Sequence, residues 1–191
     1  MPSQLRAFVA VEIPHDVLAA LESVQAELKR RLRARWVRPG SMHLTLKFLG
    51  DIPADRVASV ADAAQAAAGG HSGFSLTASG LGVFPSIRRP RVIWSGFSGQ
   101  TGLLLDLQRS LEERLVALGF PQEDRPFRAH LTLGRFSEPA EPGLMAEVVK
   151  SYDGRTFGEI AVKELVLFQS DLQPKGSVYT ALARARLKEW F

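Results

Sequence analysis

The sequence predicts a two-lobed domain of strands and helices, and an internal repeat is the main reason. The tetrapeptide His-Leu-Thr-Leu occurs twice, at residues 43–46 (the first motif) and at residues 130–133 (the second motif), 87 residues apart. The same offset carries the helical pattern of residues 21–32 onto residues 108–119. Two copies favour a closed pair of lobes packed about a pseudo-twofold axis, because solenoids need three or more repeats.

The first half contains three predicted strands and two predicted helices. β-Branched and aromatic runs predict strands at residues 5–13, 43–50 and 74–84, and apolar residues at helical spacing predict helices at 17–32 and 54–70. Pro14 ends the first strand, and Gly50 is expected to end the second. Between the first helix and the first motif, the sequence predicts a loop that contains a Pro-Gly turn.

The second half repeats this order from Pro90 onward. Strands are predicted at residues 90–97, 130–136, 159–170 and 177–187, and helices at 103–119 and 144–152. A loop with two prolines precedes the second motif. We therefore expect residues 1–191 to form one bilobal domain with approximate halves 1–88 and 89–191.

Composition places the chain among soluble globular proteins. Of 191 residues, 46% are hydrophobic and 23% charged, and a net charge of +4 gives a mild preference for anionic partners. The absence of cysteine excludes disulfides, thiolate metal sites and cysteine nucleophiles. Residues 7–11 are too short an apolar run for a signal peptide, and no run is long enough for a membrane span. We expect a cytoplasmic monomer that does not bind membranes.

Strand alternation places the polar and apolar side chains of each motif on opposite faces. His43 and Thr45 share one face, as do His130 and Thr132, while the leucines of both motifs face the core. A twofold relation would bring the two polar faces to one cleft. Two imidazoles of pKa about 6.5 can serve as acid and base near neutral pH, and hydroxyls can donate to phosphate oxygens. The motifs therefore predict in-line displacement at phosphorus.

Other chemistries fit the sequence less well. A zinc site would need a third ligand, and no acidic residue lies at strand or helix spacing from either histidine of the motifs. A serine triad would need a nucleophile elbow, which is missing. His15 and His71 have the surroundings of ordinary surface residues. We therefore expect no metal at the site.

The paired His-x-Thr-x motifs resemble those of the two-histidine (2H) phosphoesterase superfamily. The chain is most similar to the bacterial and archaeal branch of RNA 2′,3′-cyclic phosphodiesterases, also called 2′-5′ RNA ligases. The resemblance lies in RAFVAVEIP, RWVRPGSMHLTLKFLGD, GLGVFPSIRRPRVIW, LGFPQEDRPFRAHLTLGR and LVLFQSDLQPKGSVYTAL. It implies an α+β bilobal fold, in which two pseudo-twofold-related lobes each have an antiparallel sheet flanked by helices, with a cleft between them. It also implies that no metal or cofactor takes part.

The resemblance assigns a role to each polar residue of the motifs. His43 would be the general acid that protonates the departing ribose 3′-oxygen, and His130 the general base that activates water. Thr45 and Thr132 would hold the phosphate oxygens. The substrate would be an RNA end with a 2′,3′-cyclic phosphate, such as a tRNA fragment, and the product a 2′-phosphate. With a 5′-hydroxyl as nucleophile, the same geometry would give 2′-5′ ligation.

Five further residues are expected to bind substrate. Arg135 resembles an arginine that the family uses near the phosphate, and guanidinium suits bidentate phosphate contact. Its repeat equivalent, Phe48, is either a platform for a base or a core aromatic. Arg128 and Lys47 each lie two residues from a motif position, which strand alternation places on the polar face. Tyr179 lies in the last strand near the expected cleft, where packing is an alternative role.

The sequence departs from the family pattern at two positions and leaves two rival functions open. The branch often has Pro where this chain has Ala129, and Ala where it has Gly134, which could alter the flexibility of the cleft. One rival is a phosphodiesterase for a small nucleotide, either a 2′,3′-cyclic nucleotide or ADP-ribose 1″,2″-cyclic phosphate. The other is an RNA-binding module without catalysis.

Overall fold

The computed structural model describes residues 4–138, 140–174 and 176–189, which form nine strands, four α-helices and two short 3₁₀-helices. In chain order the elements are β1 (Gln4–Glu12), α1 (His15–Lys29), β2 (Arg35–Trp36), η1 (Pro39–Ser41), β3 (His43–Pro53), η2 (Ala54–Arg56), α2 (Val57–Ala68), β4 (Phe74–Phe84), β5 (Val92–Gly99), α3 (Thr101–Ala117), β6 (Leu131–Arg135), α4 (Pro142–Ser151), β7 (Thr156–Val162), β8 (Glu164–Gln173) and β9 (Gly176–Arg186). None of the helices in these ranges is long and apolar enough to cross a membrane.

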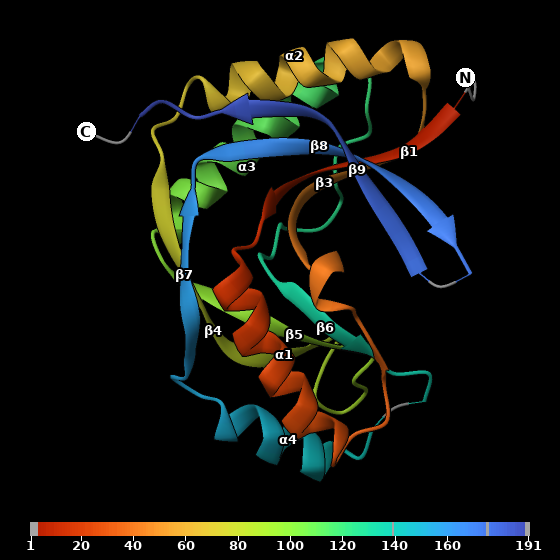
Figure 1. Ribbon diagram of the computed structural model, residues 1–191, viewed down its shortest axis with the longest axis vertical. Coiled ribbons are helices and arrows are strands. Elements are labelled where there is room, and N and C mark those ends of the chain that lie inside the picture. Colours follow the sequence, from red (N-terminus) through yellow and green to blue (C-terminus); the bar gives the residue numbers. More distant parts are fainter. Residues whose placement is uncertain (1–3, 139, 175, 190–191) are drawn as a thin grey trace.

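The strands form two antiparallel sheets, one in each lobe. The four-stranded sheet has the order β3-β1-β8-β9, and the five-stranded sheet has the order β2-β6-β5-β4-β7. Helices α2 and α3 pack on the first sheet, and α1 and α4 on the second, so that the helix pairs lie at opposite ends of the molecule in Figure 1. This arrangement confirms the expected bilobal α+β fold.

The two sheets are built by exchange between the sequence halves. The 87-residue offset relates β1 to β5, α1 to α3, β3 to β6, α2 to α4 and β4 to β8. The pattern β3-β1-β8 in one sheet matches β6-β5-β4 in the other. Strand β4 thus lies in the sheet of the second motif, and β8 lies in the sheet of the first. Helices α1 and α3 are exchanged in the same way, so neither lobe coincides with one half of the sequence.

The predicted strand at residues 159–170 is wrong, because the structure has two strands there in different sheets. Strand β7 pairs with β4, and β8 pairs with β1, with only Lys163 between them. Residues 165–168 are buried consecutively, since β8 is an inner strand with both faces covered. The charged pair Lys163-Glu164 between the two apolar stretches marks the point at which the chain passes from one lobe to the other.

The predicted strand end at Gly50 is also wrong, since β3 continues to Pro53. Ala7 pairs with Gly50 while its neighbour Phe8 pairs with Phe48, which leaves one extra residue in β3. Gly50 has a φ of 69°, a conformation that glycine adopts without steric cost. The glycine thus accommodates a β-bulge instead of ending the strand.

The leucines of both motifs face the core, as strand alternation predicts. Leu44, Leu46, Leu131 and Leu133 are all nearly inaccessible to solvent. The main core lies between each sheet and its helices, and it includes the leucines at helical spacing in α3. Burial of such side chains contributes about 1.5–3 kcal/mol each and fixes the opposite, polar face of each motif on the other side of its sheet.

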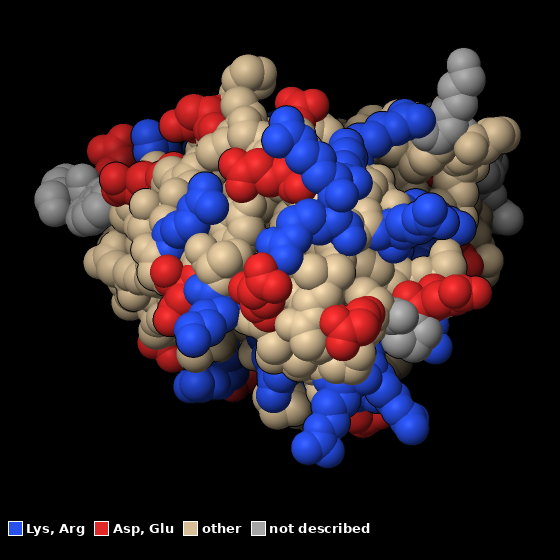
Figure 2. Space-filling model, turned by 90° about the horizontal axis from the view of Figure 1, so that it is seen from below, with Lys and Arg blue, Asp and Glu red and all other residues tan. Residues whose placement is uncertain are grey.

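On the face that Figure 2 shows, the positive charge lies in separate groups. Figure 2 views the molecule from the end that carries α1 and α4, where Lys and Arg side chains alternate with Asp and Glu. With a net charge of only +4, such a surface gives a modest attraction for polyanions.

A close contact between α1 and β7 yields a stability test. A Cβ added to Gly158 would lie 2.8 Å from Cγ2 of Val17, at a φ of 125°. We expect Gly158→Ala to lower the free energy of unfolding by about 2 kcal/mol, because overpacking adds to backbone strain. Urea denaturation measures the change, and Gly102→Ala, where a Cβ meets open space, is the matched control. Equal stability of the two variants would contradict this packing.

Candidate active site

His43 begins β3 and lies on the face of the sheet opposite the helices. Its ring centroid is 6.0 Å from that of Phe8, 4.9 Å from Phe168 and 5.1 Å from Tyr179. Its Nδ1 lies 3.2 Å from the carbonyl oxygen of Ser41. A carbonyl oxygen can only accept, so Nδ1 carries a proton and Nε2 is the nitrogen that exchanges protons.

His130 lies directly before β6 in the other lobe and has equivalent surroundings. Its Nδ1 donates to the carbonyl oxygen of Arg128 over 2.7 Å. Its ring stands edge-on to Phe84, with centroids 5.0 Å apart, and lies 6.3 Å from the ring of Trp94. In both motifs, therefore, the backbone two residues earlier fixes the tautomer, and aromatic rings fix the plane of the imidazole.

Burial lowers the pKa of both imidazoles below the ordinary value of 6.5. The hydrogen bond from Nδ1 to the backbone opposes the lowering of the pKa in each case, and the carboxylate of Glu12 also opposes it at His43. The positive charge of Arg135 lowers the pKa of His130 further. Arg135 therefore acts electrostatically on the second imidazole, although its own side chain is exposed.

A β-bulge follows the first motif and changes which side chains share the face of His43. Thr45 pairs with Ala10, but Lys47 pairs with the preceding residue of β1, Val9, which leaves Leu46 as the extra residue. Leu46 and Lys47 are consequently both buried on the core side, and Phe48 returns to the outer face. Simple alternation therefore fails after Leu46.

The second motif has the same bulge at the equivalent position. Thr132 pairs with Trp94, while Gly134 pairs with the preceding residue of β5, which leaves Leu133 as the extra residue. Arg135 then takes the position that Phe48 has in the other lobe. The two bulged strands thus present His, Thr and one large side chain each, a phenylalanine in one lobe and an arginine in the other.

The expectation that Lys47 binds substrate is wrong. Its side chain is only 3% exposed, and its Nζ donates to Oε1 of Glu112 and to the carbonyl oxygen of Pro121. The bulge turns Lys47 away from the face of His43. The lysine is therefore fully engaged inside the lobe and has no access to a ligand of the histidines.

The other expected binding residues lie on or beside the faces of the two histidines. Phe48 is 62% exposed, with its ring 5.7 Å from that of Phe8, so it is not a core aromatic. Tyr179 is partly buried and packs edge-on against His43. Arg128 is exposed, its backbone holds the second imidazole, and its guanidinium carbon lies 6.0 Å from the ring centroid of Phe84.

Sequence reasoning missed the aromatic residues beside the imidazoles, most clearly Trp94. Its indole crosses two glycines, since a Cβ on Gly82 would lie 2.3 Å from it and one on Gly96 3.3 Å. The indole Nε1 is buried without a partner among the residues that the structure describes. Gly82 is the cross-strand partner of Trp94 and Gly96 lies two residues after it in β5, so the available signal was a tryptophan at spacing two from a glycine within one strand. In the part of the chain that the structure describes, no group of three or more His, Asp or Glu side chains lies close enough together to hold a metal ion.

The sequence matches a known family and has curated relatives. The sequence model of the LigT-like phosphoesterases matches residues 11–94 and 98–179, and each range contains one of the two motifs. Over 178 residues the chain is 33% identical to an RNA 2′,3′-cyclic phosphodiesterase of Archaeoglobus fulgidus, covering 93% of this chain and 98% of that relative.

Solved structures agree with the sequence comparison. The crystal structure of TT0787 of Thermus thermophilus aligns with a TM-score of 0.79 at 30% identity, covering 98% of this chain and all of that one. LigT of Escherichia coli, crystallised with 3′-AMP, aligns with a TM-score of 0.75 at 27% identity, covering 96% of this chain and 98% of that one. Together with the two motifs, these matches show that the chain is an enzyme of the LigT-like phosphoesterase family.

Proposed function

We propose that this enzyme hydrolyses the 2′,3′-cyclic phosphate at RNA ends to a 2′-phosphomonoester, without a metal. The observation that carries the proposal is the equivalence of the two imidazoles. Each is held through Nδ1 by the carbonyl two residues earlier, and each packs against aromatic rings. Relatives over nearly the full length, including those of Archaeoglobus fulgidus and Thermus thermophilus, are named RNA 2′,3′-cyclic phosphodiesterases.

The proposed reaction needs one acid and one base on opposite sides of phosphorus. Nε2 of His130 takes a proton from water as the water oxygen bonds to phosphorus. The bond between phosphorus and the ribose 3′-oxygen breaks, and Nε2 of His43 protonates that oxygen. The product has a 3′-hydroxyl and a 2′-phosphate. Exchange with solvent then returns the proton to His43 and removes it from His130, which completes the cycle.

The remaining residues of the two faces would bind the charged part of the substrate. Thr45 and Thr132 offer hydroxyl donors to the non-bridging oxygens, and Arg135 offers a positive charge. Donors fixed in advance at a developing charge stabilise the transition state without reorganisation. With these groups supplying the neutralisation, the reaction requires no Lewis acid. A 5′-hydroxyl in place of water would give 2′-5′ ligation by the same proton transfers.

The exposed aromatic surface favours an RNA end over a small cyclic nucleotide. Phe48 projects from the outer face beside Phe8, and its 62% exposure leaves the ring free for stacking. Aromatic platforms of this kind bind unstacked bases with little sequence preference. Arg128 and Arg135 lie beside the second motif, where they would meet the phosphates of a longer strand.

Removing either imidazole should nearly abolish hydrolysis. We expect His43→Ala and His130→Ala each to lower kcat for a 2′,3′-cyclic phosphate oligonucleotide roughly 100-fold or more, because a general acid or base is lost. Excess EDTA should leave the wild-type rate unchanged. His15→Ala, at an exposed position at the start of α1, is the control. Full activity of either motif variant, or activity lost to EDTA and restored by a divalent ion, would refute the mechanism.

The lowered imidazole pKa values predict the pH dependence. In the free enzyme the acid must be protonated and the base neutral, so kcat/KM should follow a bell centred below pH 6.5. The bound phosphate is negative and favours imidazolium, so the bell for kcat should lie at higher pH. Steady-state rates from pH 4 to 9 measure the pH dependence of kcat/KM and of kcat. A kcat/KM that rises monotonically to about pH 9 would exclude the histidine pair.

Phe48 should distinguish RNA from mononucleotides. We expect Phe48→Ala to raise KM for a cyclic-phosphate oligonucleotide roughly tenfold, since stacking contributes about 1–3 kcal/mol per base. Leu103→Ala, which shortens an exposed apolar side chain on α3, is the control. If the wild type turns over oligonucleotides and mononucleoside 2′,3′-cyclic phosphates with equal kcat/KM, the RNA-specific part of the proposal fails.

A further inference from the structure

We propose that two buried polar clasps position the two histidines relative to each other, each joining the strand of one motif to the segment that leads into the other motif. The Lys47 clasp consists of Lys47, Glu112, Pro121 and Glu123, and the Gln25 clasp of Gln25, Val37 and Leu133. The inference rests on the proposed function. Its central residues would be positioning residues, because none lies on the face that carries the imidazoles.

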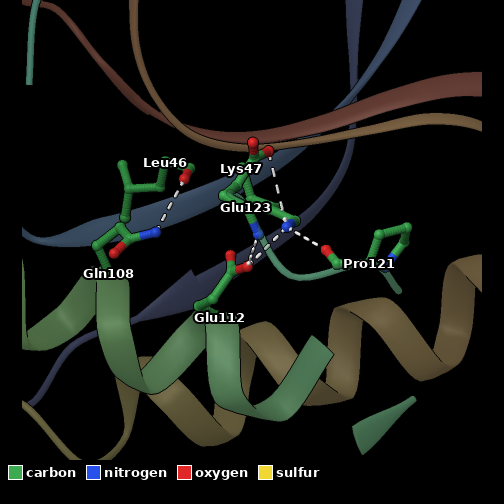
Figure 3. Close-up of polar contacts among 6 residues, drawn as sticks. All are labelled: Leu46, Lys47, Gln108, Glu112, Pro121 and Glu123. Atoms are coloured by element: carbon green, nitrogen blue, oxygen red, sulfur yellow. Dashed lines mark hydrogen bonds and ion pairs between the residues drawn. The ribbon is translucent and has the colours of Figure 1, made fainter. Parts of the chain in front are cut away.

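The Lys47 clasp joins the first motif to the segment that enters the second. Nζ of Lys47 donates to Oε1 of Glu112 over 2.8 Å and to the carbonyl oxygen of Pro121 over 2.7 Å. The same Oε1 accepts from the backbone N–H of Glu123 over 2.9 Å. Figure 3 shows the side chain of Glu112, on α3, directed toward Nζ of Lys47 and the backbone N–H of Glu123. Lys47 follows the first motif directly, whereas Pro121 and Glu123 belong to the irregular segment before the second.

Helix α3 also holds the bulged residue of the first motif. Nε2 of Gln108, one turn before Glu112, lies 3.5 Å from the carbonyl oxygen of Leu46 (Figure 3). The bulge, Lys47 and the entering segment are thus all anchored on one face of one helix. Movement of that segment would require breaking contacts of a lysine that is only 3% exposed and a glutamate that is 12% exposed.

The Gln25 clasp makes the reciprocal connection in the other lobe. Gln25 lies in α1 and is 1% exposed. Its Nε2 donates to the carbonyl oxygens of Val37 and Leu133, each over 2.8 Å. The N–H of Val37 donates to the same oxygen of Leu133 over 2.9 Å. Leu133 is the bulged residue of the second motif, and Val37 lies in the segment that enters the first.

The two clasps occupy equivalent places in the repeat but use different chemistry. The 87-residue offset takes Gln25 to Glu112 and the bulge at Leu46 to the bulge at Leu133. One clasp uses an amide and backbone carbonyls, and the other uses an ion pair. Buried polar groups add little net stability, because desolvation offsets their attraction, but an unpaired one is costly. Such groups therefore favour one arrangement of the backbone over others.

Catalysis by two separate imidazoles depends on their relative position, since a displacement of about 1 Å of a catalytic group can cost about 100-fold in rate. We therefore expect Gln25→Leu and Lys47→Met to lower kcat roughly 10- to 100-fold with KM changed less than about threefold. Glu112→Gln keeps an oxygen for the N–H of Glu123 but removes the charge that pairs with the buried Nζ of Lys47, so it should lower kcat as well. Val148→Ala, a core truncation in α4, should lower Tm without this loss of kcat.

Amide hydrogen exchange tests the crossed connection without measuring activity. Lys47→Met should accelerate exchange of the N–H of Glu123, which donates to Glu112, by about tenfold or more, and leave the N–H of Val37, which donates to Leu133, at the wild-type rate. Gln25→Leu should give the opposite pattern. Val148→Ala should accelerate the exchange of neither N–H. If Lys47→Met does not fold, Lys47→Met/Glu112→Gln removes both charges together and should give the same pattern.

The outcomes separate this inference from the proposed function. Wild-type protein inactive on every cyclic phosphate would refute the function, and the exchange pattern would then decide whether the clasps make the crossed connection. Active wild type with kcat of Gln25→Leu and Lys47→Met within about threefold of it would overturn the positioning role. Amide hydrogen exchange that accelerates only beside each substituted residue, or does not accelerate at all, would also overturn the positioning role.

Discussion

The exchange of strands and helices between the sequence halves is the constraint on which the rest of the structure depends. Because β4 and β8 change places, the sheet that contains each motif strand is completed by a strand from the opposite half, which pairs with the neighbour of the motif strand. The exchanged helices α1 and α3 then carry Gln25 and Glu112 beneath the motif of the other half. A duplicated chain without exchange would give two lobes whose relative position depends only on a linker. Here the backbone itself joins each histidine strand to both lobes.

Burial and charge have opposite effects on the two imidazoles, and this opposition suits the proposed chemistry. The aromatic surroundings fix each ring and lower its pKa, which favours the neutral form that a base requires. An acid requires the protonated form, and the negative phosphate of the substrate supplies that preference when it binds. Arg135 lies on the side of His130, where its charge further lowers the pKa. The asymmetry between Arg135 and Phe48 is thus the clearest difference between two otherwise equivalent motifs.

Local periodicity was sufficient to predict the helices, the two motifs and the faces of their leucines, because those features depend on neighbours in sequence. It failed where the geometry depends on the partner strand. Lys47 was misplaced because the bulge at Leu46 is set by pairing with β1, and one extra residue reverses alternation. The change of sheet coincides with the charged pair Lys163-Glu164, but two charged residues between two apolar stretches do not by themselves show that the stretches pair in different sheets. The clasps depend on contacts between residues far apart in the sequence, which a single sequence does not reveal.

The central claim is that both imidazoles flank one phosphorus atom. A crystal structure of the protein with inorganic phosphate or a nucleoside vanadate tests it most directly. The account predicts Nε2 of His43 and Nε2 of His130 at about 2.7–3.2 Å from two different oxygens on a single phosphorus or vanadium. An anion held by one imidazole alone, with the other ring beyond reach of any of its oxygens, would contradict the account.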